Sequence, residues 1–319
     1  MSEQIDLTGQ IDDALSGSRL DVAAAQLFPQ HSRSRLQGWI KSGELQVNGA
    51  TRRTRDRVVT GELVEIRATV EDDVTWQPEE LPLDIVYEDE ALLVLNKPAG
   101  LVVHPAAGNR SGTLLNALLY YDPGQAALPR AGIVHRLDKD TTGLMVVART
   151  LEAHTHLVNQ LQERSVHREY LAVVNGWVTG GGRVEKQIGR HAAQRKKMAV
   201  VEHGGKPAIT HYRVERRFAH YTALRVELET GRTHQIRVHM AHIKYPLVGD
   251  PSYGGRPRVP RGADQDLIDA LRNFPRQALH ARKLSLVHPA SGDQMTWHAP
   301  EPEDLKQLLQ TLQEFDPSD

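Results

Sequence analysis

The first seventy residues combine helical and strand spacings of their apolar side chains. Apolar residues recur at helical intervals over 20–28, and a second helix is expected between Ser32, which suits an N-cap, and Gly43. Short strands are predicted over 45–49, which ends in an Asn-Gly turn, and over 58–66. This pattern predicts a pair of helices beside a small sheet.

Strand patterns outnumber helical ones after residue 83. Residues 224–229 alternate between apolar and charged side chains, as in a strand with one buried face, and 84–95 is typical of a hairpin. Further strands are expected over 144–148, 170–175, 198–201, 208–215, 284–287 and 295–297, and helices over 113–120, 150–162 and 236–243. Because strands dominate without regular alternation with helices, we predict an α+β fold with a mainly antiparallel mixed sheet.

The formal net charge of the 319 residues is only -1, but the charges are grouped along the chain. Residues 31–57 carry seven Lys or Arg and two acidic residues, and residues 183–217 carry ten Lys or Arg and three acidic residues. Residues 71–90 carry nine acidic residues and no base. Local positive surface attracts a phosphate backbone whatever the total charge, although each block is equally compatible with an ordinary solvated face.

The acidic stretch and its two prolines are typical of a linker. We therefore predict a small domain over residues 1–70, an acidic linker over 71–82 and a larger domain over 83–319. With 39% hydrophobic residues, a chain of this length can bury a sizeable core.

Composition excludes several classes of site. The chain has no cysteine, which excludes disulfides, thiol catalysis and thiolate metal sites and favours a cytoplasmic location. No apolar run approaches the roughly 18 residues of a membrane span, and the start does not resemble a secretory signal. The common nucleotide-binding and serine-hydrolase motifs are absent. His234, His239 and His242 do not share one helix face, so we predict no metal site.

The basic residues of the first domain form a candidate RNA-binding surface. They lie on the second predicted helix and in the loop after the turn, where they can track a phosphate backbone: Arg33, Arg35, Lys41, Arg52, Arg53 and Arg55. Residues 17–70 also resemble an S4 RNA-binding domain, on the motifs Arg19-Leu20-Asp21, Ser32-Arg33-Ser34-Arg35 and Val47-Asn48-Gly49. The alternative is a basic helix pair without a ligand.

A charged loop over 132–143 separates two apolar segments and is a candidate site. A lone carboxylate there is more often a structural turn residue. The sequence Val-His-Arg-Leu-Asp-Lys-Asp-Thr-Thr-Gly, however, resembles the active-site motif of the RluA-type pseudouridine synthases. Three further segments, 96–105, 168–172 and 228–240, resemble other motifs of that family, and the resemblance covers essentially the whole chain.

The resemblance implies roles for individual residues. Asp138 corresponds to the essential carboxylate, which either attacks C1′ of the target uridine or removes a proton from C2′. Arg237 corresponds to its ion-pair partner, and Tyr170 to the tyrosine that stacks on the target base. The implied substrate-binding residues are Arg136, which enters the stack vacated by the flipped base, Leu228, which packs beside it, Arg232 and His234. The structural alternatives are a surface arginine, a core tyrosine and a core leucine.

The implied reaction isomerises uridine to pseudouridine without a cofactor or a metal. The detailed motifs resemble the branch of the family that acts on large-subunit ribosomal RNA. The resemblance implies that the partner is large-subunit ribosomal RNA or the assembling large subunit, and that the target is the helix 69 stem-loop. Two alternatives stay open. One is a sister synthase acting on other ribosomal or transfer RNA uridines, and the other is a non-catalytic RNA-binding assembly factor.

Overall fold

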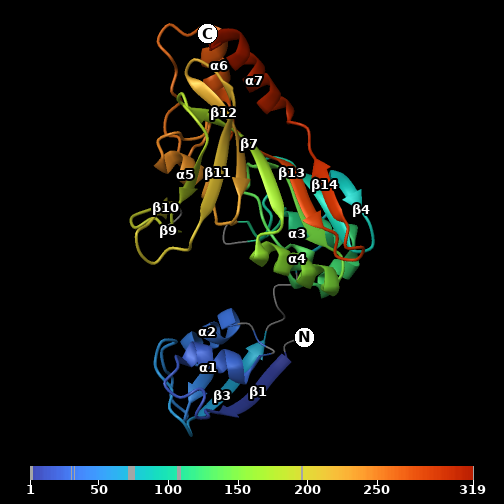
Figure 1. The fold of residues 1–319 in the computed structure, drawn as a ribbon. Coiled ribbons are helices and arrows are strands. Elements are labelled where there is room, and N and C mark those ends of the chain that lie inside the picture. Colours follow the sequence, from blue (N-terminus) through green and yellow to red (C-terminus); the bar gives the residue numbers. More distant parts are fainter. Residues whose placement is uncertain are drawn as a thin grey trace. The chain divides into compact units, whose positions relative to one another are not determined.

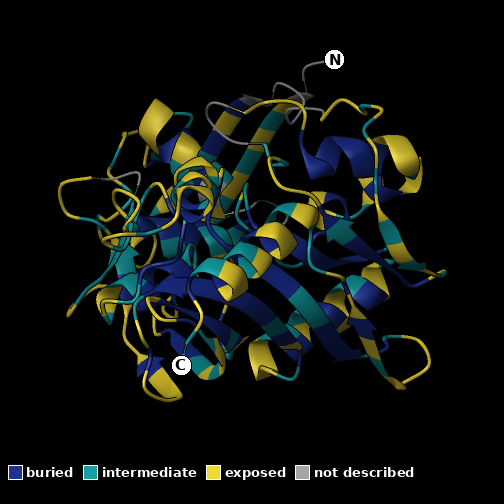
Figure 2. Cartoon of the chain, turned by 90° about the horizontal axis from the view of Figure 1, so that it is seen from above, coloured by how far each residue is buried: buried dark blue, intermediate teal, exposed yellow. Residues whose placement is uncertain are grey.

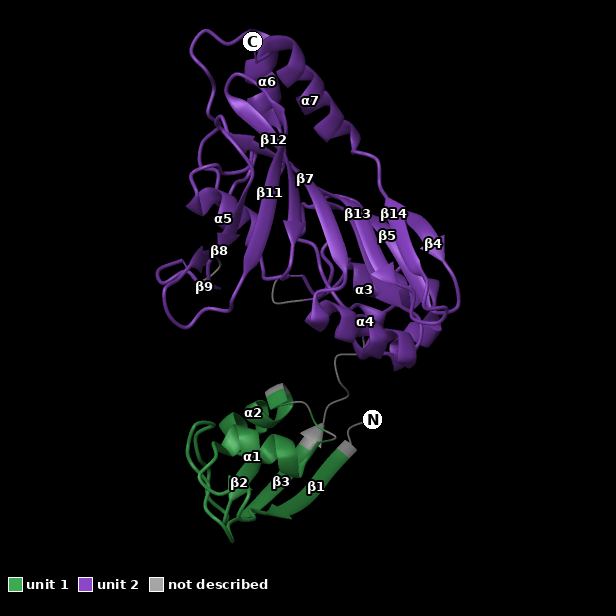
Figure 3. Cartoon of the chain, in the orientation of Figure 1, with its two compact units in different colours: residues 1–75 green, residues 76–319 purple. Residues whose placement is uncertain are grey.

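The computed structural model describes residues 3–29, 31, 33–70, 76–105, 109–194 and 197–318. Its contacts divide the chain into two compact units, Met1–Thr75 and Trp76–Asp319 (Figure 3). The predicted N-cap Ser32 and residues 71–75 of the predicted linker lie outside the described residues.

The small unit is a helix pair packed on an antiparallel sheet with the strand order β1-β3-β2. Its elements are β1 (Glu3–Gln10), α1 (Leu20–Leu27), α2 (Arg33–Ser42), β2 (Leu45–Val47) and β3 (Leu63–Val70). Leu20, Leu36 and Ile66 are among the buried side chains that form its core. Both helices and β2 match the sequence pattern. Strand β1 was not predicted, and β3 begins later than residue 58 because the chain first turns through Gly61, which has a φ of 89°.

The large unit is built on a nine-stranded sheet with the order β4-β5-β6-β13-β7-β12-β11-β8, and β14 pairs with β13. The strands are β4 (Ile85–Glu88), β5 (Leu92–Lys97), β6 (Thr142–Ala148), β7 (His167–Asn175), β8 (Gly182–Glu185), β11 (Ile209–Arg217), β12 (Tyr221–Leu228), β13 (Leu279–Val287) and β14 (Gln294–His298). Among the described residues, β6 and β13 run parallel and the other pairs in this sheet are antiparallel. The predicted α+β class with a mixed, mainly antiparallel sheet is confirmed.

Helices cover both faces of this sheet. One face packs against α3 (Leu114–Tyr121) and α5 (Gln235–His242), and the other against α4 (Leu151–Glu163), α6 (Gln265–Asn273) and α7 (Glu303–Phe315). Figure 1 shows α3 and α4 near one end of the sheet and α6 and α7 near the other. The strands lie beneath helices whose outer surfaces are exposed (Figure 2). Helices α6 and α7 were not predicted from the sequence.

Neighbouring residues of a strand face opposite helical layers, as the period of two requires. On β7, Tyr170 belongs to the core beneath α3 and α5, whereas Leu171 belongs to the core beneath α6 and α7. Strand β6 is buried at every position, which explains why residues 144–148 form a continuous apolar run.

The second half of the predicted linker is attached to the large unit. The side-chain amide of the buried Asn116 donates to the Gln77 carbonyl at 2.8 Å, and the Asn116 carbonyl accepts from the Glu79 amide at 3.0 Å. Residues 77–79 are therefore held against α3. The linker stays a prediction for residues 71–75. No helix in the described part of the chain is long and apolar enough to cross a membrane.

A buried histidine fixes α5 to the sheet. The Nδ1 atom of His239 lies 2.9 Å from the Thr210 hydroxyl on β11, and its Nε2 atom lies 3.3 Å from the Lys186 carbonyl. Burial lowers the pKa of His239 to about 4. The imidazole is therefore neutral when the folded protein is near neutral pH.

We expect His239 to make the folded state less stable in acid. In the unfolded chain its pKa returns to about 6.5, so between about pH 6.5 and pH 4 the unfolded state binds more protons and stability falls as the pH falls. The variant His239→Gln should lose this contribution, which is at most about 1.4 kcal/mol per pH unit. Urea unfolding at several pH values measures the slope. The exposed His242→Gln on the same helix is the control, and equal slopes for the parent and His239→Gln would contradict the assignment.

Candidate active site

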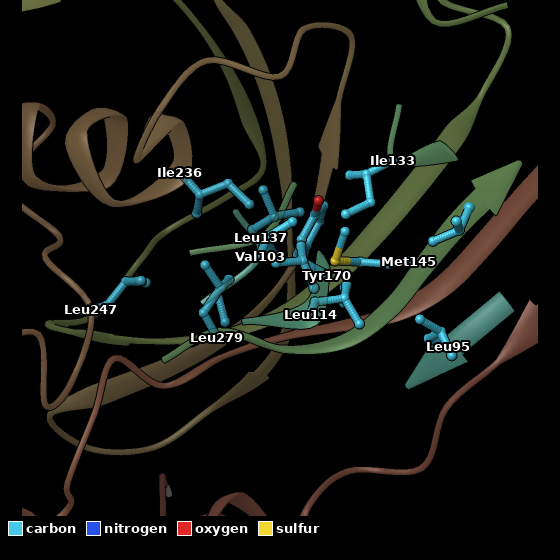
Figure 4. Close-up of a cluster of buried hydrophobic side chains, with 14 of the residues drawn as sticks. Leu95, Val103, Leu114, Ile133, Leu137, Met145, Tyr170, Ile236, Leu247 and Leu279 are labelled. Atoms are coloured by element: carbon cyan, nitrogen blue, oxygen red, sulfur yellow. The ribbon is translucent and has the colours of Figure 1, made fainter. Parts of the chain in front are cut away.

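Asp138 lies in a loop that joins the 3-10 helix η2 (Pro129–Gly132) to β6. Two apolar side chains fix this loop to the core. Ile133 and Leu137 are both buried in the same cluster as Tyr170, and the backbone of Ile133 also forms an isolated β-bridge with Val147. Figure 4 shows Ile133 and Leu137 on either side of the Tyr170 ring. Because its neighbour Leu137 is anchored in this way, Asp138 is held at the edge of the core rather than on a free turn.

Polar side chains fix the backbone of the same loop. The ammonium group of Lys97 is fully buried and donates to three carbonyl oxygens, those of Pro98 at 2.7 Å, Leu101 at 3.0 Å and Lys139 at 2.8 Å. Burial lowers the pKa of Lys97 to about 7, and the nearby Asp140 and Asp138 carboxylates oppose that shift. Lys97 therefore ties the loop that follows β5 to the loop that carries Asp138.

Arg276 holds the far side of the loop. Its guanidinium donates to the Asp140 carbonyl at 3.3 Å and forms two short bonds, of 2.6 and 2.8 Å, with the Asp304 carboxylate on α7. The neighbouring Gln277 donates to the Thr141 hydroxyl at 3.0 Å. Helix α7, which is distant in sequence, thus takes part in placing the loop.

The Asp138 carboxylate faces a buried arginine. Nη1 of Arg237 on α5 donates to Oδ2 of Asp138 at 3.1 Å. The other edge of the same guanidinium binds both oxygens of the buried Asp250, at 2.7 and 2.9 Å. Burial disfavours the charge on Arg237, but hydrogen bonds and charges from Asp250 and Asp138 outweigh it and raise the Arg237 pKa. Burial likewise opposes ionisation of Asp250, yet Arg237 holds the Asp250 pKa below its ordinary value.

Backbone amides and an aromatic ring complete this arrangement. Oδ1 of Asp250 accepts from the amides of Ser252 at 2.8 Å and Tyr253 at 3.0 Å. The Tyr253 ring lies 5.1 Å from the Arg237 guanidinium carbon, in cation–π range. The carboxylate of Asp250 is thus satisfied by four donors, and Arg237 is held against Asp138 in one orientation.

His234 lies on the other side of Asp138. Its Nε2 atom is 3.9 Å from Oδ1 of Asp138, and its Nδ1 atom is 2.8 Å from the Tyr253 hydroxyl. The same hydroxyl accepts from the Met198 amide at 2.9 Å. Burial lowers the pKa of His234, although Asp138 opposes the shift. His234 is the N-cap residue of α5, and its φ of 56° turns the chain sharply just before the helix begins.

One small cavity of about 50 Å³ contains the candidate residues. Its lining includes Arg136, Asp138, Arg168, Tyr170, Leu228, Arg232, His234 and Arg237. The structure therefore brings together all the residues that the sequence proposed as catalytic or substrate-binding. Burial raises the pKa of Tyr170, Arg168 opposes the shift and Asp138 adds to it. Tyr170 is consequently a neutral phenol near pH 7. Arg136 is exposed at the rim, and Nε of Arg232 donates to the Pro207 carbonyl at 3.0 Å.

A larger cavity of about 830 Å³ adjoins the first and shares Arg136, Arg168, Gly231 and Arg232 with it. Its volume lies in the range of ordinary ligand pockets. Among the described residues, no group of three or more His, Cys, Asp or Glu is placed to hold a metal ion.

The model of the RNA pseudouridylate synthase family matches residues 91–242, and that of the S4 domain matches residues 18–64. The sequence is 61% identical to Ribosomal large subunit pseudouridine synthase D of Pseudomonas aeruginosa, over 98% of each chain. It is 56% identical to the protein of the same name from Yersinia pestis, over 98% of this chain and 96% of that one. The chain belongs to the RNA pseudouridylate synthase family. It is therefore an isomerase, and RNA is its partner.

Solved structures agree with this membership. Human RNA Pseudouridylate Synthase Domain Containing 4 superposes with a TM-score of 0.58 at 25% identity, over 72% of this chain and 93% of that one. Human RNA Pseudouridylate Synthase Domain Containing 1 gives a TM-score of 0.53 at 25% identity, over 78% of this chain and 100% of that one. The large unit thus has the fold of a pseudouridine synthase domain.

The six basic residues predicted to bind RNA differ in exposure and in ion pairing within the small unit. Arg33 is fixed, because its Nη2 atom donates at 2.7 Å to the buried Asp21, which also binds Arg19 and Gln37. Arg52 forms an ion pair with Glu62 at 2.6 Å, and Arg53 lies 3.6 Å from Asp56. Arg35 is half-buried. Lys41 and Arg55 are exposed. All six remain proposed RNA contacts.

Four residues that build this candidate site were not singled out from the sequence: Lys97, Asp250, Tyr253 and Arg276. Lys97 lies in the quoted segment 96–105, but its burial beside the Asp138 loop has no local signal. Asp250 and Tyr253 lie thirteen and sixteen residues after Arg237, so only the fold brings them under its guanidinium. A buried charge needs such partners, and the sequence does not identify them.

We expect Lys97→Met to destabilise the protein. Methionine retains the apolar stem, but the three carbonyls lose their shared donor in a site closed to water. The free energy of unfolding should fall by about 2–4 kcal/mol, measured by chemical denaturation. Lys139→Met, at an exposed position of the same loop, should change it by less than about 0.5 kcal/mol. Equal stabilities for the two variants would contradict the role given to Lys97.

Proposed function

We propose that this protein converts uridines to pseudouridines in large-subunit ribosomal RNA, with Asp138 as the essential carboxylate. The observation that carries the proposal is the placement of Asp138 against Arg237 in one cavity with Tyr170. The names of the relatives from Pseudomonas aeruginosa and Yersinia pestis support the large ribosomal subunit as substrate. The proposed target is the helix 69 stem-loop, either in free RNA or in an assembling subunit. The proposed location of the protein is the cytoplasm.

The chemistry breaks the C1′–N1 bond of a uridine, turns the uracil and joins C5 to C1′, after which C5 loses a proton and N1 gains one. Asp138 acts either by attacking C1′ or by removing a proton from C2′. Both routes require an ionised carboxylate near the sugar. Arg237 places a permanent cation against Asp138 and, through Asp250, keeps its own geometry when the substrate enters.

The base must leave its helical stack to reach Asp138, at a cost of a few kcal/mol. The exposed Arg136 lies at the rim, where a planar guanidinium can replace the lost stacking partner. The Tyr170 ring and Leu228 supply apolar walls for uracil.

We expect Asp138→Asn to abolish pseudouridine formation. The amide can neither attack C1′ nor accept the C2′ proton, so turnover of a large-subunit RNA fragment should fall by at least about 10³-fold. RNA binding and thermal unfolding should stay close to those of the parent, because asparagine has the same shape. Asp140→Asn makes the same chemical change two residues away and should leave most activity. Full turnover by Asp138→Asn would refute the catalytic assignment.

The RNA target is tested by mapping pseudouridines in large-subunit RNA from cells that lack the protein. We expect specific sites in the helix 69 stem-loop to disappear, and to return with the parent gene but not with Asp138→Asn. Loss of sites elsewhere would indicate a sister synthase specificity. An unchanged map, with RNA binding intact, would favour a non-catalytic assembly factor.

A further inference from the structure

In the part of the chain that the structure describes, Arg168 is a buried cation without an ion-pair partner. It lies on β7, two residues before Tyr170, and its relative exposure is only 8%. Its Nε atom is buried and has no hydrogen-bond partner. Within the described residues, its guanidinium forms neither an ion pair nor a hydrogen bond to a side chain. Such a group is costly to bury, because it loses its water shell and gains no compensating partner.

Arg168 borders both cavities of the site. It lines the small cavity with Asp138 and the large one with Arg130, Arg136 and Arg232. Gly231 leaves room for its head, since a Cβ atom built at Gly231 would lie 2.9 Å from Nη1 of Arg168. The guanidinium therefore stands at the junction between the pocket at Asp138 and the larger cavity.

A second unpaired donor lines the same large cavity. Nε2 of His135 accepts from the Val146 amide at 3.0 Å, so the proton of the neutral ring is on Nδ1. That Nδ1–H is buried and has no acceptor among the residues that the structure describes. Burial, reinforced by the charge of Arg168, lowers the pKa of His135 to about 3, which keeps the ring neutral.

The missing partner must supply acceptors and negative charge. Buried polar groups are normally paired, and two unpaired donors on one cavity indicate a ligand rich in acceptor oxygens. A uracil carbonyl would satisfy one donor but would leave the positive charge uncompensated. A phosphodiester supplies acceptor oxygens for both donors and a negative charge for Arg168, since guanidinium binds phosphate oxygens through charge-assisted hydrogen bonds.

We propose that Arg168 and the Nδ1–H of His135 bind one phosphodiester group of the RNA, at the linkage beside the uridine that reaches Asp138. This inference rests on the proposed function and names the part of the RNA that its site holds. The pairing fixes the strand at the junction of the two cavities. Arg168 thereby sets how far the target nucleotide extends toward Asp138 and Tyr170.

The test compares full-length parent and Arg168→Gln for binding to the target stem-loop at several salt concentrations. Loss of one phosphate contact should lower affinity about tenfold and reduce the log–log salt slope by about 0.7–0.9. Arg272→Gln, at an exposed position on α6, removes the same charge away from the cavities and should leave the slope unchanged. If Arg168→Gln does not fold, Arg168→Lys, which keeps the charge but lacks the Nε donor, replaces it in the affinity and methylphosphonate comparisons only. Its salt slope should equal that of the parent, because the charge is retained.

A second arm locates the phosphate. Neutral methylphosphonate replaces, one at a time, the linkages that flank the target uridine. At one linkage the parent should lose about tenfold in affinity, whereas Arg168→Gln should lose less than about twofold. Equal penalties in the two proteins at every linkage, or an unchanged salt slope, would overturn the proposal.

Conversion of the same RNA by the parent separates this inference from the proposed function. If the parent forms pseudouridine but Arg168→Gln behaves like the parent in both binding arms, the phosphate site is refuted and the function stands. If the Arg168-dependent linkage is found but no uridine is converted, the function is refuted and the phosphate site stands.

Discussion

The site depends on one guanidinium shared between two carboxylates. Arg237 is buried, and a buried cation is stable only when its charge and its hydrogen bonds are met within the protein. Asp250 meets most of that demand through two short bonds, which leaves one Nη atom for Asp138. Asp138 is thus held by a cation whose position does not depend on Asp138 itself. Removing one partner of a buried pair typically costs about 3–5 kcal/mol, so this geometry is strongly enforced.

The fold supplies this pair from two directions. Asp138 comes from the loop before β6, fixed by Lys97 on one side and by Arg276 on the other. Arg237 comes from α5, which packs on the same sheet face as the side chain of Tyr170. A sheet covered on both faces cannot shift its strands without disturbing two cores, and interiors of this density transmit small displacements. The separation of Asp138 and Arg237 is therefore set by the packing of the whole large unit.

The sequence predicted those parts of the protein that have a local signal. The alternation at 224–229 identified β12, and the apolar run at 144–148 identified β6, because burial on one or both faces determines the pattern of a strand. The Asp138–Arg237 contact followed only from the family resemblance. Asp250 under Arg237 and Arg276 beside the Asp138 loop were missed, since the contacts of each depend on elements brought together by folding. Helices α6 and α7 were missed although they bury leucines at helical spacing.

The arginines of this unit fall into two groups with different partners. Arg237 and Arg276 are buried and are neutralised by aspartates, so their charge is used within the fold. Arg168 is also buried, but no described aspartate or glutamate pairs with it, and Arg136 is exposed at the same cavities. A net charge of -1 conceals this division, because the acidic side chains that balance the total are elsewhere in the sequence. Positive charge left unpaired where two cavities meet is the electrostatic condition for holding a polyanion, and it occurs two residues before Tyr170, whose ring is proposed to stack on the base.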